Sequence, residues 1–305
     1  MPVPVGFVGL GLMGSAMSAH LLRAGHEVIG CDLDAARLRE HEERGGVAVD
    51  SPAEAAARAG VVITSLPSVR ALADVVHGPD GLAARPSDGL VVVETSTLPV
   101  QAKEDARGRL ERRGVRLLDA PLSGTAEQAR HRDLVAYVSG DDDAKARALP
   151  VLDAMTRACH DVGPFGNGTA MKIVANLLVA VHNLAAAEAL LLAEHAGLDA
   201  ATVLRAIGDG AGTSRMFEVR GPLMAAGAYG EPTMRTGLFE KDLQIIDAFA
   251  AKMRVPTPLF SAASAYYRAA LAQGRGDEDT ACVHAVLAGL APELTPDLPP
   301  EKETK

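Results

Sequence analysis

The chain has 305 residues, of which 48% are hydrophobic and 23% charged. At about 150 residues per domain this length suggests roughly two domains, and the composition excludes a disordered chain, a collagen and a coiled-coil rod. The formal net charge is −9, and aromatic residues make up only 3%. Because an acidic protein repels phosphate backbones and anionic membranes, we expect neither nucleic acid nor a membrane surface as a partner.

The three cysteines, Cys31, Cys159 and Cys282, are too few for a disulfide framework and suit a reducing compartment. No charged leader followed by an apolar run opens the sequence, so we expect no signal peptide and a cytoplasmic protein. No cluster of His and Cys has metal-ligand spacing, so no metal site is predicted.

The first half of the chain alternates short apolar runs with amphipathic stretches. The runs predict strands over residues 5–10, 27–31, 61–65, 90–95, 115–119 and 134–139. The stretches between them predict helices, including 13–24, 35–44, 69–76 and 101–113. This alternation is typical of a mostly parallel, doubly wound sheet covered by helices on both faces, which is a Rossmann-type α/β domain.

The pattern changes at residues 163–168, where Gly and Pro predict a loop. Beyond it the spacing is helical, so we predict a dinucleotide-binding domain over 1–163 and an all-α domain for substrate binding and oligomerisation over 164–290. Residues 291–305 contain four Pro and alternating charge, which predicts a disordered tail. The apolar window 173–193 includes Asn176, Asn183 and Glu188, so it is interpreted as a buried helix rather than a membrane span.

A dinucleotide-binding motif opens the first domain. The run Gly9-Leu10-Gly11-Leu12-Met13-Gly14 fits G-x-G-x-x-G between a predicted strand and helix. Gly9 allows the tight turn, Gly11 lets the backbone approach a pyrophosphate, and Gly14 allows close packing of helix and strand. Leu12 and Met13 complete the cofactor-binding run.

Asp32 ends the second predicted strand, 18 residues after Gly14. Its carboxylate would accept hydrogen bonds from the adenosine ribose and repel a 2′-phosphate. The next residue, Leu33, offers no cation to such a phosphate. We therefore expect NAD as cofactor and keep NADP as the alternative, because Arg37 or Arg39 could reach back.

Four blocks in order resemble the β-hydroxyacid dehydrogenase family, the group of 3-hydroxyisobutyrate dehydrogenase and tartronate semialdehyde reductase. The blocks are the glycine run from Phe7 to Ser18, Ser96-Thr97, Asp119-Ala-Pro-Leu-Ser-Gly124, and Gly166-x-Gly168-x-x-x-Lys172-x-x-x-Asn176. A Lys241-Asp242 pair follows. The resemblance covers roughly residues 5 to 290.

The resemblance implies a Rossmann domain followed by an all-α domain, and a homodimer or homotetramer. It implies that Lys172 is the catalytic acid/base and that Asn176 helps to hold the substrate. Ser123 and Gly124 would bind the substrate carboxylate. The remaining implied cofactor contacts are Leu66, Pro67, Ser96, Thr97 and Lys241.

The residues around Lys172 suit that chemistry. On a helix, Asn176 lies about 40° and Asn183 about 20° from Lys172, so one stripe carries an ammonium and two amides. The helix is otherwise too apolar to face water. Desolvation would favour the neutral amine, which is the form that accepts a proton from a substrate hydroxyl. A solvated lysine at the first turn is the structural alternative.

Two departures from the family pattern affect the substrate-binding loop. Thr125 replaces a Gly and should narrow the pocket while adding a hydrogen bond, which favours a hydroxylated sugar acid such as threonate over 3-hydroxyisobutyrate. Arg132 also replaces a Gly, and is either a second anion contact or a surface charge.

We therefore predict an NAD(P)-dependent oxidoreductase that transfers hydride between nicotinamide and a small β-hydroxyacid or its semialdehyde. One alternative is a related imine reductase, which typically has Asp or Tyr in place of the lysine. The other is a non-catalytic dinucleotide-binding module.

Overall fold

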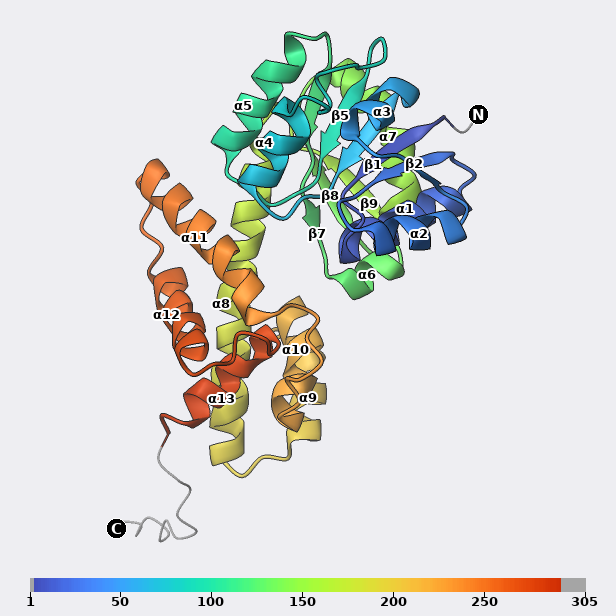
Figure 1. Cartoon of the computed structure of the whole chain (residues 1–305). Coiled ribbons are helices and arrows are strands. Elements are labelled where there is room, and N and C mark those ends of the chain that lie inside the picture. The colour runs from blue at the N-terminus through green and yellow to red at the C-terminus, as the bar shows by residue number, and fades with distance from the viewer. Residues whose placement is uncertain (1–2, 292–305) are drawn as a thin grey trace, which may run out of the picture. The chain divides into compact units, whose positions relative to one another are not determined.

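The structure of the chain is a computed structural model that describes residues 3–291 (Figure 1). The chain divides into two compact units, Met1–Ala175 and Asn176–Lys305. The first unit is α/β and the second is helical, as the sequence predicts. The predicted tail over 291–305 lies outside the described residues except for Ala291.

A six-stranded parallel sheet in the order β3-β2-β1-β4-β5-β6 forms the centre of the first unit (Figure 1). Every residue of β1, β2, β4 and β5 is buried. Strands that are apolar along their whole length are expected where helices cover both faces of a sheet. The strands are β1 Val5–Val8, β2 Val28–Cys31, β3 Val47–Ala48, β4 Val61–Thr64, β5 Val91–Glu94 and β6 Arg116–Asp119.

A second, three-stranded sheet follows β6. Its strands are β7 Leu122–Ser123, β8 Val135–Val138 and β9 Ala158–Asp161, with β7 antiparallel and β9 parallel to β8. The strand predicted over 134–139 therefore belongs to this sheet and not to the parallel one. β3 and β7 escaped prediction because two residues are too few to show a period of two. β9 was not predicted because it contains the polar residues His160 and Asp161 and is half exposed.

Seven helices connect these strands: α1 Leu12–Arg23, α2 Ala35–Glu43, α3 Pro52–Arg58, α4 Val69–His77, α5 Val100–Glu111, α6 Ala126–Arg130 and α7 Asp142–Met155. Several begin at side-chain caps, because Ser, Thr or Asp accepts a first-turn backbone N–H. Ser51 and Ser68 do so for α3 and α4, and Asp141 for α7.

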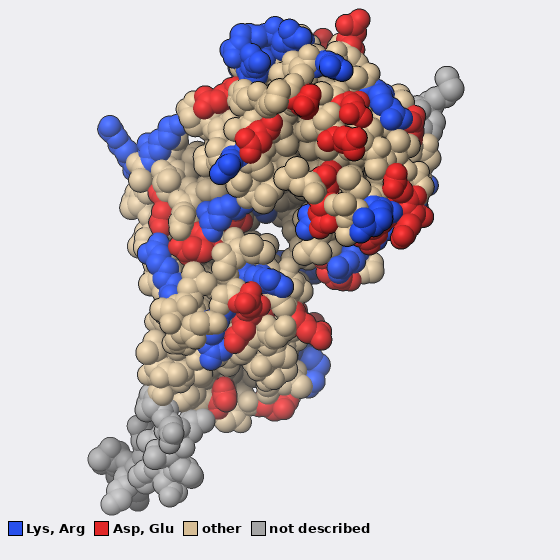
Figure 2. All heavy atoms as spheres, viewed as in Figure 1, with Lys and Arg blue, Asp and Glu red and all other residues tan. Residues whose placement is uncertain are grey.

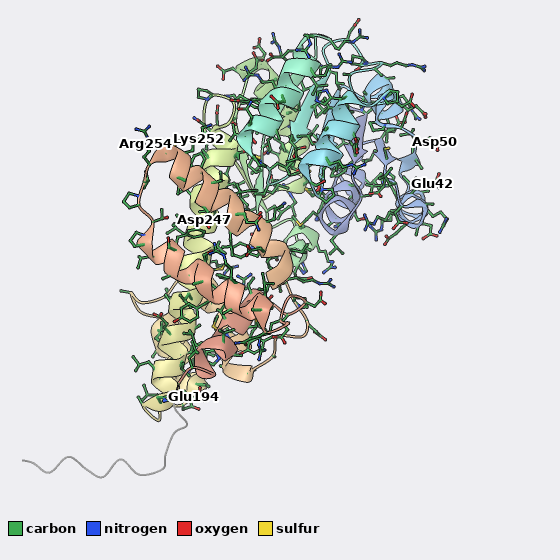
Figure 3. The ribbon with its side chains drawn as sticks, turned by 60° about the vertical axis from the view of Figure 1, so that its left-hand side comes forward. Glu42, Asp50, Glu194, Asp247, Lys252 and Arg254 are labelled. Carbon is green, nitrogen blue, oxygen red and sulfur yellow. The ribbon has the colours of Figure 1, made fainter. Side chains whose placement is uncertain are left out.

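The long helix α8, Asn167–His195, starts in the first unit and continues into the second. The other helical elements are α9 Ala200–Gly208, α10 Arg215–Ala226, α11 Thr236–Met253, α12 Pro258–Ala272, the 3₁₀ turn η1 Thr280–Cys282 and α13 Val283–Ala288. Lys252 and Arg254 lie at the carboxyl end of α11, where cations complement the helix dipole (Figure 3).

A buried ion pair lies inside the second unit. Arg220 Nε lies 3.2 Å from Asp279 Oδ1, and the side chains are 3% and 0% exposed. Burial alone would raise the pKa of Asp279. The Arg220 charge and N–H donors of Ala281 and Met234 outweigh burial and lower that pKa. The carboxylate is therefore ionised and ties α10 to the turn before η1.

By length and composition α8 could cross a membrane, as the only such helix among residues 3–291. Core helices of soluble proteins meet the same criterion, and Asn183 shows this one to be part of a protein core. Asn183 is fully buried and donates to Tyr267 Oη and to the Thr280 carbonyl, both at 2.8 Å. These two contacts satisfy the N–H donors of the amide inside the folded unit.

Candidate active site

The glycine run after β1 contains two glycines that the fold itself requires. Gly9 has φ +94°, and a Cβ there would lie 2.3 Å from the Ser65 carbonyl oxygen. A Cβ at Gly14 would lie 1.9 Å from the Gly9 carbonyl oxygen. Gly9 therefore permits the turn, and Gly14 lets α1 pack closely on the strand end, as predicted.

Gly11 differs from both, because the described chain gives no steric reason for a glycine there. Its φ of −63° and ψ of −168° suit any residue, and a Cβ would meet only Arg37 Nη1, at 3.6 Å. Gly11 is also the N-cap of α1 and offers no side chain to the helix N–H groups. A bare helix N-terminus with open space above it suits a phosphate group, so the residues fit a dinucleotide.

The next two residues of the run face different environments. Leu12 is 74% exposed, whereas Met13 packs against the core of the first unit. Leu12 therefore adds apolar surface beside Gly11, and Met13 anchors the first turn of α1.

Asp32 lies at the end of β2 and holds the glycine run in place. Its Oδ2 accepts the Leu10 N–H at 2.6 Å, and its Oδ1 accepts the Asp34 N–H at 2.9 Å. Arg37 Nη1 lies 3.6 Å from the same carboxylate. Each oxygen keeps a lone pair for a ribose hydroxyl. Leu33 is fully exposed and contributes no charge.

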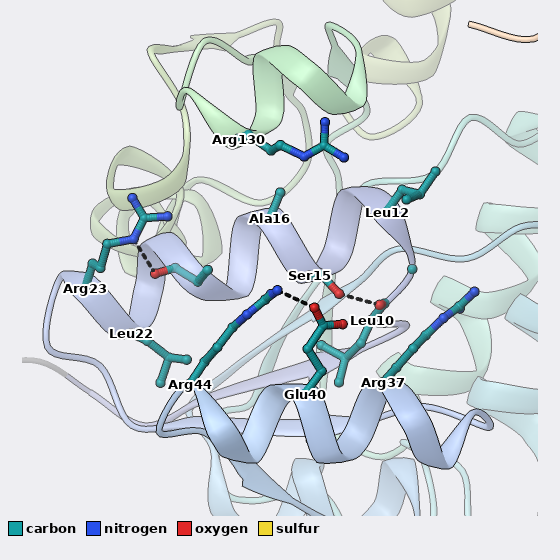
Figure 4. Close-up of a pocket in the computed structure, with 12 residues that line it drawn as sticks. Leu10, Leu12, Ser15, Ala16, Leu22, Arg23, Arg37, Glu40, Arg44 and Arg130 are labelled. Atoms are coloured by element: carbon teal, nitrogen blue, oxygen red, sulfur yellow. Dashed lines mark hydrogen bonds and ion pairs between the residues drawn. The ribbon is translucent and has the colours of Figure 1, made fainter. Parts of the chain in front are cut away.

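A hollow of about 690 Å³ lies beside Gly11, between α1 and α2 (Figure 4). It is lined by four arginines: Arg23, Arg37, Arg44 and Arg130. Three of them already have carboxylate partners, since Arg37 pairs with Asp32 and Asp34, Arg44 with Glu40, and Arg130 with Glu127. A 2′-phosphate at this end of the site would have to compete with those carboxylates.

Two predicted cofactor-lining segments are joined by a hydrogen bond. Ser96 Oγ accepts the Leu66 N–H at 2.7 Å, and the Ser96 N–H donates to the buried carboxylate of Glu94 at 2.6 Å. The loops after β4 and β5 are thereby fixed to one another. Pro67 is exposed and Thr97 half-buried on these loops.

The predicted substrate-binding loop begins in β7. Ser123 pairs with Val135 of β8, and Gly124 has φ +139°. A Cβ at Gly124 would lie 2.6 Å from Leu134 Cδ2. Gly124 is therefore required by the backbone and by packing, and Ser123 is half-buried beside it.

Thr125 has a structural role that was missed from the sequence, although Thr125-x-x-Gln128 fits the pattern of a capping box. It is the N-cap of α6 in a capping box, in which its Oγ1 accepts the Gln128 N–H and its own N–H donates to Gln128 Oε1. The hydroxyl proton of Thr125 is still available to a ligand.

Arg132 also has a structural role, through its own backbone conformation and its hydrogen bonds to backbone carbonyls. It has φ +57°, the region where a glycine is favoured, and its guanidinium donates to the carbonyls of Thr156 and Asp153. These contacts favour a structural role for Arg132 at the carboxyl end of α7 over anion binding.

A fully buried cluster surrounds Asp119, at the end of β6. Its Oδ1 accepts Lys103 Nζ and Thr169 Oγ1, both at 2.8 Å. Its Oδ2 accepts the Thr169 N–H at 2.7 Å, and Ser139 Oγ lies 3.3 Å away. Ser139 Oγ in turn accepts the Gly168 N–H at 2.9 Å. The first turn of α8 is thus capped from two strands.

Lys172 follows one turn later on α8 and is only 8% exposed. In the second unit, Asn176 donates from Nδ2 to Asp242 Oδ2 at 3.0 Å. Lys241, beside Asp242 on α11, has a side chain 43% exposed. Asn183, expected on the same stripe as Lys172, instead packs inside the second unit with Tyr267.

Both halves of the chain match known families. Residues 4–163 match the NAD-binding domain of 6-phosphogluconate dehydrogenase. Residues 166–287 match the NAD-binding family of NADP-dependent 3-hydroxyisobutyrate dehydrogenase. The chain belongs to the β-hydroxyacid dehydrogenase family. Membership confirms the predicted fold class and NAD(P) as cofactor.

Full-length relatives agree with this β-hydroxyacid dehydrogenase assignment. An L-threonate dehydrogenase of Cupriavidus necator is 35% identical over 94% of this chain and 96% of its own. The mitochondrial 3-hydroxyisobutyrate dehydrogenase of Mus musculus is 30% identical over 93% of this chain and 87% of its own. A Mycobacterium tuberculosis 3-hydroxyisobutyrate dehydrogenase, solved with L-serine, has 32% identity and a TM-score of 0.84, covering 94% and 99% of the two chains.

Several residues that shape the site in this β-hydroxyacid dehydrogenase were missed from the sequence. They are Lys103, Ser139 and Thr169, together with the side-chain partners of Asp119 and Asp242, two residues that were named only as parts of motifs. A charged residue at a buried position of an amphipathic helix is the signal that could have found Lys103. The others are small polar residues whose partners are distant in sequence.

Proposed function

We propose that this chain is an NAD-preferring dehydrogenase of a small β-hydroxyacid, with Lys172 as general acid/base. The observation that carries the proposal is the burial of Lys172. Lysines are almost never buried unless a specific environment holds them. This one stands at the family's lysine position, on the helix that follows the dinucleotide-binding half. The glycine run supports the proposal as well, because Gly11 leaves open space at the start of α1, which suits the phosphates of a dinucleotide.

The proposed chemistry divides between two parts of the first unit. Gly9, Gly11 and Gly14 would bind the pyrophosphate at the start of α1, and Asp32 would bind the adenosine ribose. NAD, when bound, supplies the hydride acceptor. Lys172 would take the hydroxyl proton of the substrate during oxidation and return it during reduction.

The substrate would be held by its carboxylate and its hydroxyl. Ser123 and Gly124 offer a hydroxyl and backbone N–H groups that suit a carboxylate. Asn176 would hold the substrate hydroxyl, and Lys241 would lie beside the nicotinamide, as the family resemblance implies. The Asn176–Asp242 hydrogen bond supports the role of Asn176, because it fixes the orientation of the amide.

A sugar acid such as threonate is the substrate we favour. The hydroxyl of Thr125 supports it, since its proton remains available to a polyhydroxylated acid. The names of several relatives point the same way, including the L-threonate dehydrogenases of Cupriavidus necator and Escherichia coli.

We also propose that the protein is a cytoplasmic homodimer or homotetramer. The second unit exposes several large apolar side chains, among them Leu178, Leu192, Leu238 and Leu259, and such surfaces commonly mark subunit interfaces. All three cysteines are free thiols, which suits a reducing compartment. Acidic and basic side chains are interspersed on the face in Figure 2, a distribution unlike that of a basic nucleic-acid-binding surface. Light scattering tests the assembly, and a monomer would contradict it.

The test is a substrate panel followed by NADH absorbance. It contains threonate, 3-hydroxyisobutyrate, glycerate, serine, 6-phosphogluconate and the matching semialdehydes, each with NAD(H) and NADP(H). We expect turnover of threonate with NAD. Efficient turnover of 3-hydroxyisobutyrate with inert threonate would refute the substrate, and tight NADH binding without any turnover would favour a non-catalytic binder.

A further inference from the structure

We propose that Asp119, Lys103 and Thr169 form a positioning cluster that sets where Lys172 stands relative to the substrate-binding loop. The inference rests on the proposed function, in which Lys172 transfers the proton. None of the three residues is a catalytic residue in this scheme. Each acts through the helix that carries Lys172.

The donors of the cluster converge on one buried carboxylate. The carboxylate of Asp119 receives four donors from three elements, and the Lys103–Asp119 pair is 0% exposed on both sides. A buried ion pair contributes little net stability compared with an apolar replacement, because both charges lose their hydration. What such a pair does provide here is one fixed geometry, since every donor must meet the same two oxygens.

The elements that meet at Asp119 either bear or directly follow three of the family's motif blocks. Lys103 lies on α5, which begins just after Ser96-Thr97. Asp119 ends β6 and opens the loop that leads to Ser123 and Gly124. Thr169 lies in the first turn of α8. One carboxylate therefore ties the cofactor-lining loop, the substrate-binding loop and the helix of Lys172 together.

The two hydrogen bonds of Thr169 to Asp119 fix both the rotation of α8 about its axis and its position along that axis. Thr169 donates both its backbone N–H and its hydroxyl, one to each oxygen of Asp119. Lys172 is three residues further, which is about 4.5 Å along the helix axis and 60° around it. A displacement of the helix at Thr169 therefore moves Lys172 by nearly the same distance. A misplacement of about 1 Å in a reacting group lowers turnover about a hundredfold.

The sharpest test replaces Thr169 by Val, which removes the hydroxyl donor but keeps the shape and the backbone N–H. The experiment measures kcat and KM on the most active hydroxyacid of the panel, and NADH affinity by fluorescence, for wild type, T169V, K172A and the double variant. We expect T169V to lower kcat by about tenfold to a hundredfold when Lys172 is present. In the K172A background, Thr169→Val should change kcat by less than about twofold. KM and NADH affinity should be unchanged by Thr169→Val in either background.

Two further variants separate positioning from general damage. T169S retains the hydroxyl and should restore kcat. T156V is a matched control, because Thr156 is an equally buried threonine of the first unit whose hydroxyl bonds to the Leu152 carbonyl, away from α8. It should leave kcat within about twofold of wild type. The pH profile of kcat should shift in T169V but not in T156V.

The outcomes distinguish the two proposals. Equal loss from Thr169→Val in the presence and absence of Lys172 would overturn the positioning role while leaving the general acid/base intact. Normal kcat in a stable T169V would do the same. Full activity of K172A would instead overturn the proposed function, and the positioning role with it.

Discussion

Arg37 Nη1 lies 3.6 Å from the Asp32 carboxylate, so this cation beside the proposed ribose site is already engaged by an anion. A 2′-phosphate entering this site would meet the negative charge of Asp32 and would have to draw Arg37 away from it. The arrangement favours NAD, and a neutral residue at position 32 would remove one of the two carboxylates that pair with Arg37.

Replacing Asp32 by Ser should therefore weaken NADH binding and raise the ratio of NADPH to NADH affinity by about tenfold or more. The loss of two ribose hydrogen bonds accounts for the first effect, and the loss of the negative charge of Asp32 beside Arg37 for the second. Fluorescence titration with both cofactors measures it. Asp34→Asn is the matched control, because Asp34 also pairs with Arg37 but caps α2. An unchanged ratio in D32S would refute the role of Asp32.

The glycines of the α1 turn should respond differently to the same added methyl group. Gly11→Ala meets nothing closer than 3.6 Å, so the protein should fold with an unchanged Tm and lose NADH affinity by about tenfold or more. Gly14→Ala would place a Cβ 1.9 Å from a carbonyl oxygen and should destabilise the first unit itself. Thermal unfolding and NADH titration of both variants check this. Normal NADH binding by G11A would exclude a pyrophosphate at Gly11.

Much of the cofactor half of the site was predictable because its signals are local. Gly9, Gly11, Gly14 and Asp32 lie within one strand-helix-strand unit, and each residue type has a direct steric or electrostatic reason. The helical second half was equally predictable from its spacing. The two-residue strands β3 and β7 were not, because their pairing is decided by the neighbouring strand rather than by their own sequence.

The buried polar partners could not be predicted for a related reason. Nothing in the sequence indicates that Lys103 meets Asp119, or that Asp119 reaches Thr169, 50 residues later. Helical spacing placed Asn183 on the same stripe as Lys172, but it could not show that Asn183 binds Tyr267. The angular position of a residue around a helix axis does not indicate which tertiary contacts that residue makes further along the helix.

Thr125 should prove to have two separable roles. T125A removes the cap of α6 and the free hydroxyl proton, and should lower the free energy of unfolding by about 1 kcal/mol. It should also lower the kcat/KM ratio of threonate to 3-hydroxyisobutyrate, while T125S preserves both. Denaturant unfolding and the two substrates measure the effects. An unchanged substrate ratio in T125A would leave only the capping role.

Acid should destabilise the first unit through His41. Burial lowers the pKa of His41 below its usual 6.5, and the positive charge of Arg44 lowers it further. The hydrogen bond to the Val28 carbonyl raises this pKa but does not outweigh burial. As pH falls, the unfolded chain therefore protonates His41 at a higher pH than the folded chain does. The free energy of unfolding consequently declines below about pH 6.5. We expect Tm to fall between pH 7.5 and 5.5, and to fall less in H41Q. The exposed His77→Gln is the control, and an equal pH dependence in H41Q would contradict this assignment.

Lys172 should lose its function when replaced even by another cation. K172A should lower kcat by about 10²–10⁴, the usual contribution of a general acid/base. K172R keeps the positive charge but cannot give up its proton, because a guanidinium stays protonated throughout the accessible pH range. It should therefore be nearly as inactive as K172A if the residue transfers a proton, and largely active if only its charge matters. The exposed Lys252→Arg on α11 (Figure 3) is the matched control and should keep its turnover. Measured kcat, with NADH affinity unchanged in all variants, decides between proton transfer and electrostatic binding at this position.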